Sequence, residues 1–266
     1  MPSPHSDRDV LRTVAQRRAL LEALADGPRQ KRDLVERLDC SRSTVDRGVR
    51  ELEQVEFVRR EEGASGGYRL TAAGRLALEA YRRSVETFEA IGEATEVLGY
   101  VPRDAPMSSA LLEGARVTEP PSHAPYEPLE RLVDEISVAN RIRGVIAAER
   151  TPKTRTQLYD RTVEGDLDVE AVLAEDLASF LIEQHPEQVR DVILEGAFDM
   201  YAVESVPYEF TIIETPTESK VFVFILNETA EIRGVITNET DAALEWASDV
   251  YAQIRATARP LSPPSD

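Results

Sequence analysis

The chain has 266 residues, a formal net charge of −18 and 42 % hydrophobic residues, which is enough to bury a core in one or two domains. Its longest hydrophobic stretch, residues 221–226, has the length of a strand, so we expect no membrane-spanning helix. Cys40 is the single cysteine, which excludes a disulfide within one chain. With no apparent secretory leader, these features predict a cytoplasmic protein.

The acidic charge is distributed unevenly along the chain. The first 75 residues are close to neutral, and nearly all the acidic excess follows them. A near-neutral module on an acidic body would meet DNA only through its own face. Together with the acidity, the scarcity of lysine indicates a salt-accumulating haloarchaeal source, although a GC-rich bacterium would show a similar arginine bias. The lysines are Lys31, Lys153 and Lys220.

The first 75 residues predict three helices followed by a hairpin. Residues 57–60 and 68–70 read as short strands around a glycine-rich tip at 63–67. The order helix, turn, helix, hairpin is typical of a winged helix-turn-helix, which we place at residues 8–75. The predicted helices cover residues 9–24, 30–38 and 41–54.

The third predicted helix has one apolar and one polar face. Ser41 or Ser43 caps it, because a serine oxygen can accept a hydrogen bond from a free amide of the first turn. Val45, Val49 and Leu52 share the apolar face at helical spacing. Hydroxyl and guanidinium groups on the polar face can reach bases and phosphates in a major groove. The predicted DNA-binding residues are Arg42, Ser43, Thr44, Arg47 and Arg50 here, and Arg59, Arg60 and Tyr68 on the hairpin.

A long helix is predicted to follow, with Thr71 as its cap and residues 76–97 as a dimerisation segment. Leu78, Tyr81, Val85 and Phe88 repeat at spacings of three, four and three, the pattern of a coiled-coil seam. We therefore expect a homodimer, because winged-helix regulators usually read two half-sites. The alternative is that the helix packs back on its own domain.

Prolines concentrate in residues 98–126, which predicts a linker with a short helix at 108–113. Residues 127–257 then alternate between helix and strand patterns and predict an α/β regulatory domain, before a loose tail at 258–266. The strands at 144–148 and 167–173 are expected to be parallel, and those between 198 and 237 antiparallel. The fold class is thus two-domain: winged helix-turn-helix, long linking helix, and α/β sensor-like domain with a mixed sheet. The predicted helices of this domain cover 127–139, 153–163, 175–184, 187–194 and 241–256, and its last four strands 198–203, 208–214, 221–226 and 232–237.

The segment Gly67-Tyr68-Arg69-Leu70-Thr71-Ala72-Ala73-Gly74 resembles archaeal winged-helix regulators of the methanogenesis or filamentation regulator family. Segments 172–177, 206–210 and 233–247 are similar to that family's middle domain. The resemblance implies a dimeric DNA-binding regulator with a C-terminal sensing or interaction domain, laid out like TrmB-like sugar-responsive regulators.

The sequence offers little support for an enzyme. The sensor half of TrmB-like proteins is related in fold to phospholipase D-type enzymes, yet none of His5, His123 and His185 begins their His-x-Lys signature. Nucleophile-elbow, P-loop, dinucleotide and zinc-protease motifs are also absent. We expect no catalytic residue, no metal site and no cofactor.

Two further sites are hypotheses. Cys40 precedes the third helix, whose N-terminus favours a thiolate, so it is a candidate redox sensor; a small residue that simply suits the turn is the alternative. Tyr201, Glu204, Tyr208 and Glu214 are candidate walls of an effector pocket, or outward-facing residues of alternating strands.

These observations predict a dimeric transcription regulator that binds double-stranded DNA and responds to an unknown small-molecule effector or protein partner. One alternative is an interaction adaptor whose winged helix binds protein and not DNA. The other is an enzyme of the phospholipase or nuclease kind.

Overall fold

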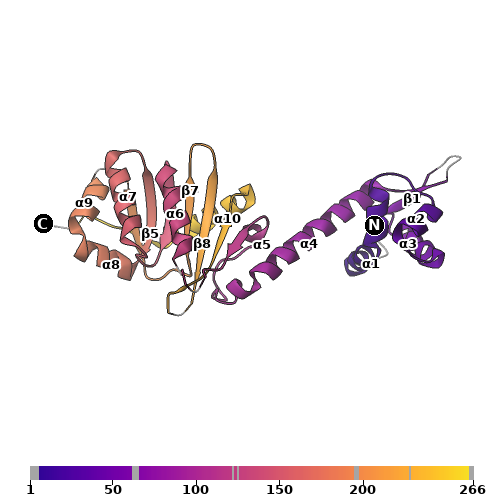
Figure 1. Ribbon diagram of the computed structural model, residues 1–266, viewed down its shortest axis with the longest axis horizontal. Helices are drawn as coiled ribbons and strands as arrows, with labels where there is room; N and C mark the ends of the chain where they lie inside the picture. The colour runs from indigo at the N-terminus through magenta and orange to yellow at the C-terminus, as the bar shows by residue number, and fades with distance from the viewer. Residues whose placement is uncertain are drawn as a thin grey trace. The chain divides into compact units, whose positions relative to one another are not determined.

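The structure, a computed structural model, describes residues 6–61, 66–121, 123–124, 126–194, 198–227 and 229–263. The chain divides into two compact units, Met1–Phe88 and Glu89–Asp266. Figure 1 shows the elements of both units. Each unit has its own hydrophobic core.

The first unit contains three helices, a two-stranded antiparallel sheet and the start of a long helix, in the predicted order. The strands pair Val58 with Leu70 and Arg60 with Tyr68. The tip at 63–65 lies outside the described residues. The elements are α1 (Asp7–Ala25), α2 (Lys31–Leu38), α3 (Arg42–Gln54), β1 (Val58–Arg60), β2 (Tyr68–Leu70) and α4 (Ala72–Leu98).

Local hydrogen bonds fix where these helices begin and end. The Ser41 hydroxyl accepts from the Thr44 amide at 3.2 Å, and the Thr71 hydroxyl accepts from the Gly74 amide at 3.0 Å, so both predicted caps are present. Asp39 ends α2 in a left-handed conformation with φ of 45°. A methyl group on Gly74 would lie 2.0 Å from the Phe57 carbonyl oxygen, which shows how closely α4 starts against the segment before β1.

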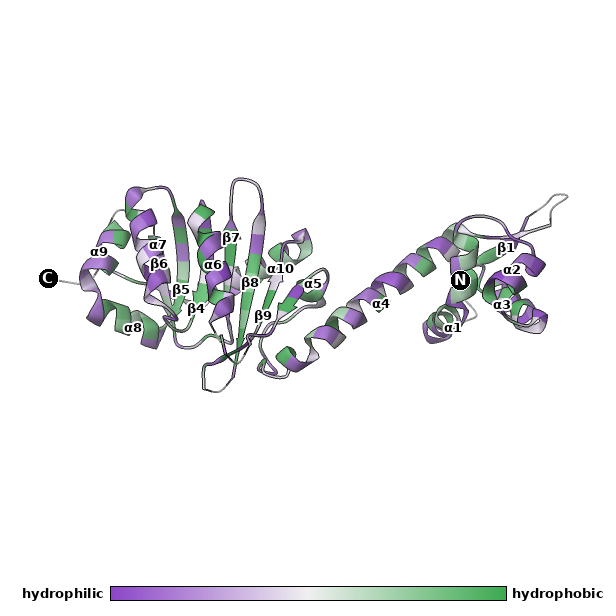
Figure 2. Cartoon of the chain, viewed as in Figure 1, coloured by the Kyte–Doolittle hydropathy of each residue, from purple (hydrophilic) through white to green (hydrophobic). Residues whose placement is uncertain are grey.

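The core of the first unit collects the apolar faces of its helices and hairpin (Figure 2). Val45, Val49 and Leu52 of α3 are fully buried, as their spacing predicts, and pack with Leu21 of α1 and Leu34 of α2. Burying such side chains is the main source of stability in a domain of this size.

The second unit is built on an eight-stranded mixed sheet with the order β10-β6-β5-β4-β7-β8-β9-β3. β4 and β5 are parallel, as predicted, and β7, β8 and β9 continue antiparallel. The strands are β3 (Arg116–Thr118), β4 (Arg141–Ile146), β5 (Asp168–Ala174), β6 (Phe198–Val203), β7 (Glu209–Glu214), β8 (Ser219–Leu226), β9 (Ile232–Asn238) and β10 (Arg259–Pro260).

Helices cover both faces of this sheet (Figure 1), and the sheet separates the apolar residues into two clusters. One cluster packs beneath α6, α7, α8 and α9. The other packs beneath α5, α10 and the last turns of α4, which contribute Ala94 and Val97. The helices are α5 (Ser109–Leu112), α6 (Glu127–Val138), α7 (Pro152–Glu164), α8 (Glu175–Gln184), α9 (Pro186–Leu194) and α10 (Asp241–Thr257).

The structure differs from the sequence predictions in three places. β6, predicted as antiparallel, pairs parallel to β5 because α8 and α9 carry the chain back across the sheet. The short helix predicted in the linker at 98–126 is present as α5, but the same segment also supplies edge strand β3. This segment is held by buried Asn238, whose amide donates to the Leu111 and Glu113 carbonyls at 2.9 Å. In the tail, Arg259 and Pro260 pair with β6 and Leu261 is buried, since the sheet edge offers free backbone groups.

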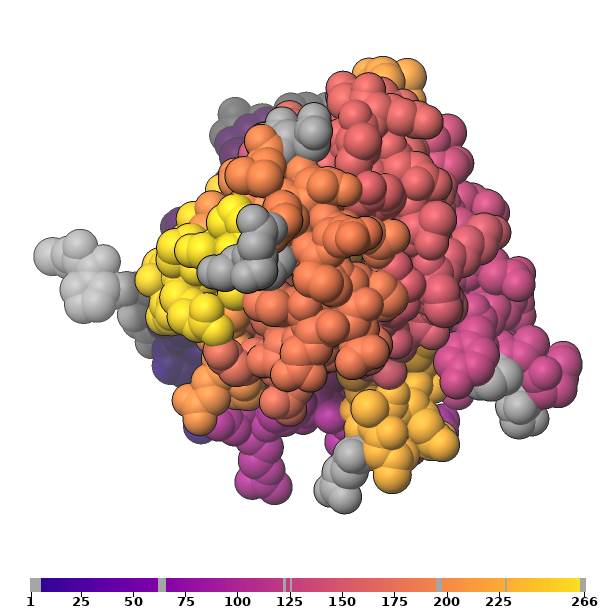
Figure 3. All heavy atoms as spheres, turned by 90° about the vertical axis from the view of Figure 1, so that its left-hand side faces the viewer, coloured from indigo at the N-terminus to yellow at the C-terminus, as the bar shows by residue number. Residues whose placement is uncertain are grey.

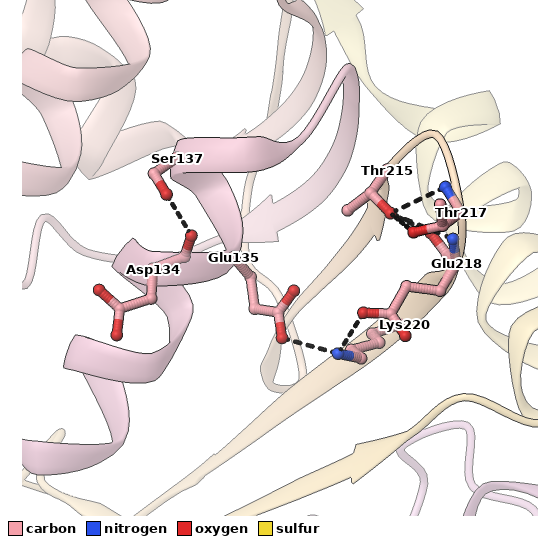
Figure 4. A network of polar contacts seen from close by, with 7 residues as sticks. All are labelled: Asp134, Glu135, Ser137, Thr215, Thr217, Glu218 and Lys220. Carbon is pink, nitrogen blue, oxygen red and sulfur yellow. Dashed lines mark hydrogen bonds and ion pairs between the residues drawn. The ribbon is translucent and has the colours of Figure 1, made fainter.

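A lysine joins a helix to the sheet of the second unit (Figure 4). Lys220 of β8 donates to Glu135 of α6 at 2.8 Å and to Glu218 at 2.7 Å. The hydrogen bonds to these two carboxylates raise the pKa of Lys220 above its usual value. The Thr215 hydroxyl closes the neighbouring turn by donating to the Glu218 carbonyl at 3.0 Å.

Candidate nucleic-acid interface

The first turn of α3 presents a cluster of exposed hydroxyl groups. Ser41 Oγ lies 2.8 Å from Ser43 Oγ and 2.9 Å from Thr44 Oγ1, in addition to capping the helix. Each of these hydroxyls can donate as well as accept a hydrogen bond. The helix start therefore offers polar groups suited to both phosphates and base edges.

Three exposed guanidinium groups line the same side of α3. Arg42, Arg47 and Arg50 are exposed, while Val45 and Val49 between them are fully buried. Within the described part of the chain, none of the three arginines forms a hydrogen bond or an ion pair. An unpaired guanidinium keeps all its donors for a ligand, and its planar fork matches a phosphate or the guanine edge.

Two of the three carboxylates of α3 are bound by cations from the neighbouring helices, whereas the third, Glu53, is exposed. Lys31 of α2 lies 2.7 Å from Asp46, and Arg17 of α1 donates to Glu51 at 2.6 Å. These hydrogen bonds hold the pKa of both carboxyl groups below their usual values. Asp46 and Glu51 thus stay ionised while the exposed guanidinium groups remain without a carboxylate partner.

The three predicted DNA-binding residues of the hairpin differ in exposure. Arg59 and Arg60 are exposed and make no ion pair with a described residue. Tyr68, in contrast, is half-buried, and its backbone pairs with Arg29 at 2.8 and 2.9 Å. Lys31 Nζ also lies 5.2 Å from the centre of its ring. Through these contacts, Tyr68 attaches the hairpin to the segment between α1 and α2.

Lys31 and Arg17 were missed by sequence reasoning. They orient α3 through contacts with residues 15 and 34 positions away, and no local pattern reveals such partners.

The predicted dimerisation residues also have unequal environments. Leu78 is 3 % exposed in the core of the first unit, and Tyr81 packs against that core. Val85 is half-buried, and Phe88 is 72 % exposed. Leu78 and Tyr81 therefore pack against their own unit, as in the alternative of a helix that packs back on its own domain, whereas Phe88 faces solvent.

Cys40 is a half-buried free thiol that packs against the core of the first unit. Its amide donates to the Val35 carbonyl at 3.4 Å, in the turn between α2 and α3. Its small side chain suits this turn, and a redox role stays a prediction.

The predicted effector-pocket residues do not share a cleft. Tyr201 of β6 lies beneath the guanidinium of Arg255, and two strands, β5 and β4, separate β6 from β7 in the sheet. Buried Tyr208 precedes β7 and donates its hydroxyl to the Pro106 carbonyl, whereas Glu214 ends β7 and pairs with Arg143. Glu204 is exposed. The sequence placed these residues on or beside predicted strands, but it could not give the strand order that separates them.

The described residues of both units contain neither a membrane-spanning helix nor a metal-ligand cluster. No described helix is long and apolar enough to cross a membrane. Among the described residues, no group of three or more His, Cys, Asp or Glu side chains is arranged to hold a metal ion.

Two family models match the sequence. The model described as the middle domain of the methanogenesis regulatory protein FilR1 matches residues 125–257. The HVO_A0261 N-terminal domain matches residues 5–93. The first match covers half of the chain and most of the second unit. None of the curated proteins compared with the chain matches it.

Several solved structures show distant likeness. TrmBL2, described as an archaeal chromatin protein with a novel mode of DNA binding, is 15% identical, with 96% of this chain and 100% of that chain covered and a TM-score of 0.42. The phospholipase D family member Nuc from Salmonella typhimurium is 15% identical over 57% of this chain and 98% of its own, with a TM-score of 0.39. Phosphatidylserine synthase from Haemophilus influenzae Rd KW20 is 12% identical over 55% of this chain and 39% of its own, with a TM-score of 0.41.

Proposed function

Because this chain belongs to the family of the methanogenesis regulatory protein FilR1, as its middle domain shows, we propose that it is a DNA-binding transcription regulator. In this proposal the first unit is a winged helix-turn-helix, with α3 as recognition helix and the β1–β2 hairpin as wing. The observation that carries it is the exposed side of α3, where Arg42, Arg47 and Arg50 face solvent without a carboxylate partner.

The recognition helix would enter the major groove with its N-terminal turn first. Ser43 and Thr44 would then hydrogen-bond to phosphates or base edges, and Arg47 would reach a guanine. Arg59 and Arg60 of the wing would contact the neighbouring backbone, a contact that adds affinity without sequence information.

A second copy of the chain would supply the second half-site. Phe88 is large, apolar and 72 % exposed, and half-buried Val85 lies one turn before it on α4. Burying the two Phe88 side chains against each other would stabilise a dimer. Leu78 and Tyr81 pack in the core of their own unit and would hold α4 in place for this contact. The second unit would change DNA affinity when it binds an effector or a partner protein.

The test is selection of binding sites from random DNA duplexes with the full chain, at low and at molar salt. We expect enrichment of a two-fold symmetric site. Arg47→Ala should weaken binding to the selected site by about 10- to 100-fold, the effect of losing one good base contact. Arg83→Ala is the matched control, because Arg83 is an exposed arginine on α4 with only a 3.8 Å contact to Glu79.

The opposite results would overturn the proposal. If no site is enriched at either salt concentration, the protein-interaction adaptor becomes the better explanation of the first unit. If Arg47→Ala and Arg83→Ala bind the selected site equally well, α3 is not the recognition helix.

A further inference from the structure

The second unit contains a cavity of about 150 Å³, and none of the predicted effector-pocket residues lines it. It lies between the sheet and the helices α6 to α9, on the face opposite α10. Figure 3 shows the outer surface of α7, α8 and α9, coloured red to orange, which covers this side of the unit. The cavity therefore belongs to one unit and is independent of the DNA-binding face.

The walls of the cavity are almost entirely hydrocarbon. Leu132 of α6, Leu158 of α7 and Val192 of α9 line the helical side, and Met200 and Phe224 line the sheet side. Protein interiors are close-packed and contain few voids larger than a water molecule, and a void forfeits the dispersion contacts of its lining. The space is half-open, and its apolar walls offer water few of the two to four polar partners that it needs, which favours a hydrocarbon group there.

The polar end of the cavity lies where β4 continues into α7. Arg150 donates to Glu209 at 2.9 Å, and Glu209 also accepts the Ala147 and Ala148 amides at 3.2 and 3.0 Å. Arg155 donates to Glu149 at 3.2 Å and also to Gln188. Each of these two guanidinium groups thus faces its own carboxylate within the rim.

The pairing of the rim charges decides which ligand fits. A charged head group would have to displace a bound carboxylate or guanidinium, and breaking such a half-buried pair is costly. An uncharged hydrocarbon group needs no such exchange and would regain the missing contacts. An engineered apolar cavity of roughly 150 Å³ in another protein binds benzene, which sets the scale of the ligand.

We propose that this cavity binds an uncharged small molecule that is mainly hydrocarbon, of the size of a single aromatic ring or a short branched alkyl chain. Any polar group of the ligand would be a neutral hydroxyl, ether or carbonyl directed to the rim. The ligand would pack α7 and α9 against the sheet and stabilise the second unit. That the ligand regulates DNA binding rests on the proposed function, whereas the binding itself does not.

The first test measures binding of benzene, toluene and indole to the full chain, by saturation-transfer NMR and by the shift in unfolding midpoint. We expect binding that rises to saturation and raises the midpoint, because a ligand that binds only the folded state stabilises it. If none of the three probes binds up to its solubility limit, the proposal is overturned.

The second test places the ligand in this cavity. Val192→Phe adds a ring to the space and should lower the affinity for the probes at least tenfold. Val163→Phe is the matched control, because Val163 lies on α7, is 40 % exposed and does not line the cavity. Equal binding to Val192→Phe and to the unchanged chain would overturn this placement.

A second cavity variant keeps the test informative if Val192→Phe does not fold. Leu158→Ala enlarges the space and should shift the preference from benzene to naphthalene by at least tenfold. An unchanged preference would also count against the site.

The regulatory role is tested separately by measuring affinity for the selected DNA site with and without a bound probe. A change in DNA affinity that Val192→Phe abolishes supports it. Probe binding that leaves DNA affinity unchanged overturns the regulatory role and leaves the ligand site standing. If the chain binds no DNA at all, the proposed function fails, while probe binding remains measurable.

Discussion

Arginines in the two units have opposite environments. On α3, Arg42, Arg47 and Arg50 are exposed and have no partner among the described residues. In the second unit the Arg150 side chain is only 17% exposed and lies 2.9 Å from Glu209, and Arg155 is 22% exposed and lies 3.2 Å from Glu149. The same side chain is therefore available to a ligand in one unit and part of the scaffold in the other.

The difference follows from where the carboxylates are. Acidic residues outnumber basic ones heavily after residue 75, so an arginine folded into the second unit readily meets a carboxylate. On α3, two of the three acidic residues, Asp46 and Glu51, are already bound by Lys31 and Arg17. Composition of the whole chain, with its net charge of −18, hides this local surplus of free positive charge.

The largest effect is expected from breaking a pair in the second unit. Glu209→Ala leaves Arg150 and the amides of Ala147 and Ala148 without their acceptor, in a place where the Glu209 side chain is only 7% exposed. We expect the free energy of unfolding to fall by about 3–5 kcal/mol, measured by denaturant titration of the full chain. Glu79→Ala, which removes an exposed 3.8 Å contact to Arg83, should change it by less than about 0.5 kcal/mol. Similar losses of unfolding free energy in Glu209→Ala and Glu79→Ala would show that the buried pair contributes no more than the exposed one.

Lys220, which binds two carboxylates in the second unit, tests whether a paired lysine is also part of the scaffold. Lys220→Met leaves Glu135 and Glu218 without their shared donor, and we expect a loss of about 1–3 kcal/mol in unfolding free energy. Because the folded-state pKa of Lys220 is raised, its contribution is fully present at neutral pH and should be lost only as the pH rises above about 10. Lys153→Met, at an exposed position on α7, is the matched control. Equal stability of the two variants would show that the Lys220 network contributes nothing.

If the proposed function is right, the hairpin arginines should contribute to DNA affinity but not to sequence choice. Arg60→Ala is expected to weaken binding to selected and random duplexes by the same factor, and to reduce the slope of log affinity against log salt by about 1. Fluorescence anisotropy at several salt concentrations measures both quantities. A larger loss on the selected site than on random DNA would assign Arg60 a base contact instead.

The smallest effect is expected for the ion pair between Asp46 of α3 and Lys31 of α2. The Lys31 hydrogen bond lowers the pKa of Asp46, so the pair stabilises the fold above the unfolded-state pKa, near pH 4, and loses its effect as the pH falls through the folded-state pKa. Carboxyl NMR titration of the full chain should show the Asp46 pKa rising in Lys31→Met. Lys153→Met should leave it unchanged, and a like response in both variants would rule out the local contact as the cause.

The sequence alone determined the features that depend on neighbours a few positions away. Helical spacing placed Val45, Val49 and Leu52 in the core, and hydroxyl residues at helix starts marked the caps Ser41 and Thr71. The parallel pairing of β4 and β5 followed from the helix between them. These signals are local, because a helix turn and a cap involve only three or four consecutive residues.

Only the tertiary structure decided what depends on distant partners. The prolines near residue 110 suggested a linker, yet Asn238, 127 positions away from Leu111, holds this segment against the sheet. Spacing on α4 could not tell that Leu78 faces its own core while Phe88 faces solvent. Which arginines are free and which are paired was equally hidden, since Arg150 and Glu209 are 59 residues apart. Such pairs meet only when the strand order is set, and residue patterns do not encode that order locally.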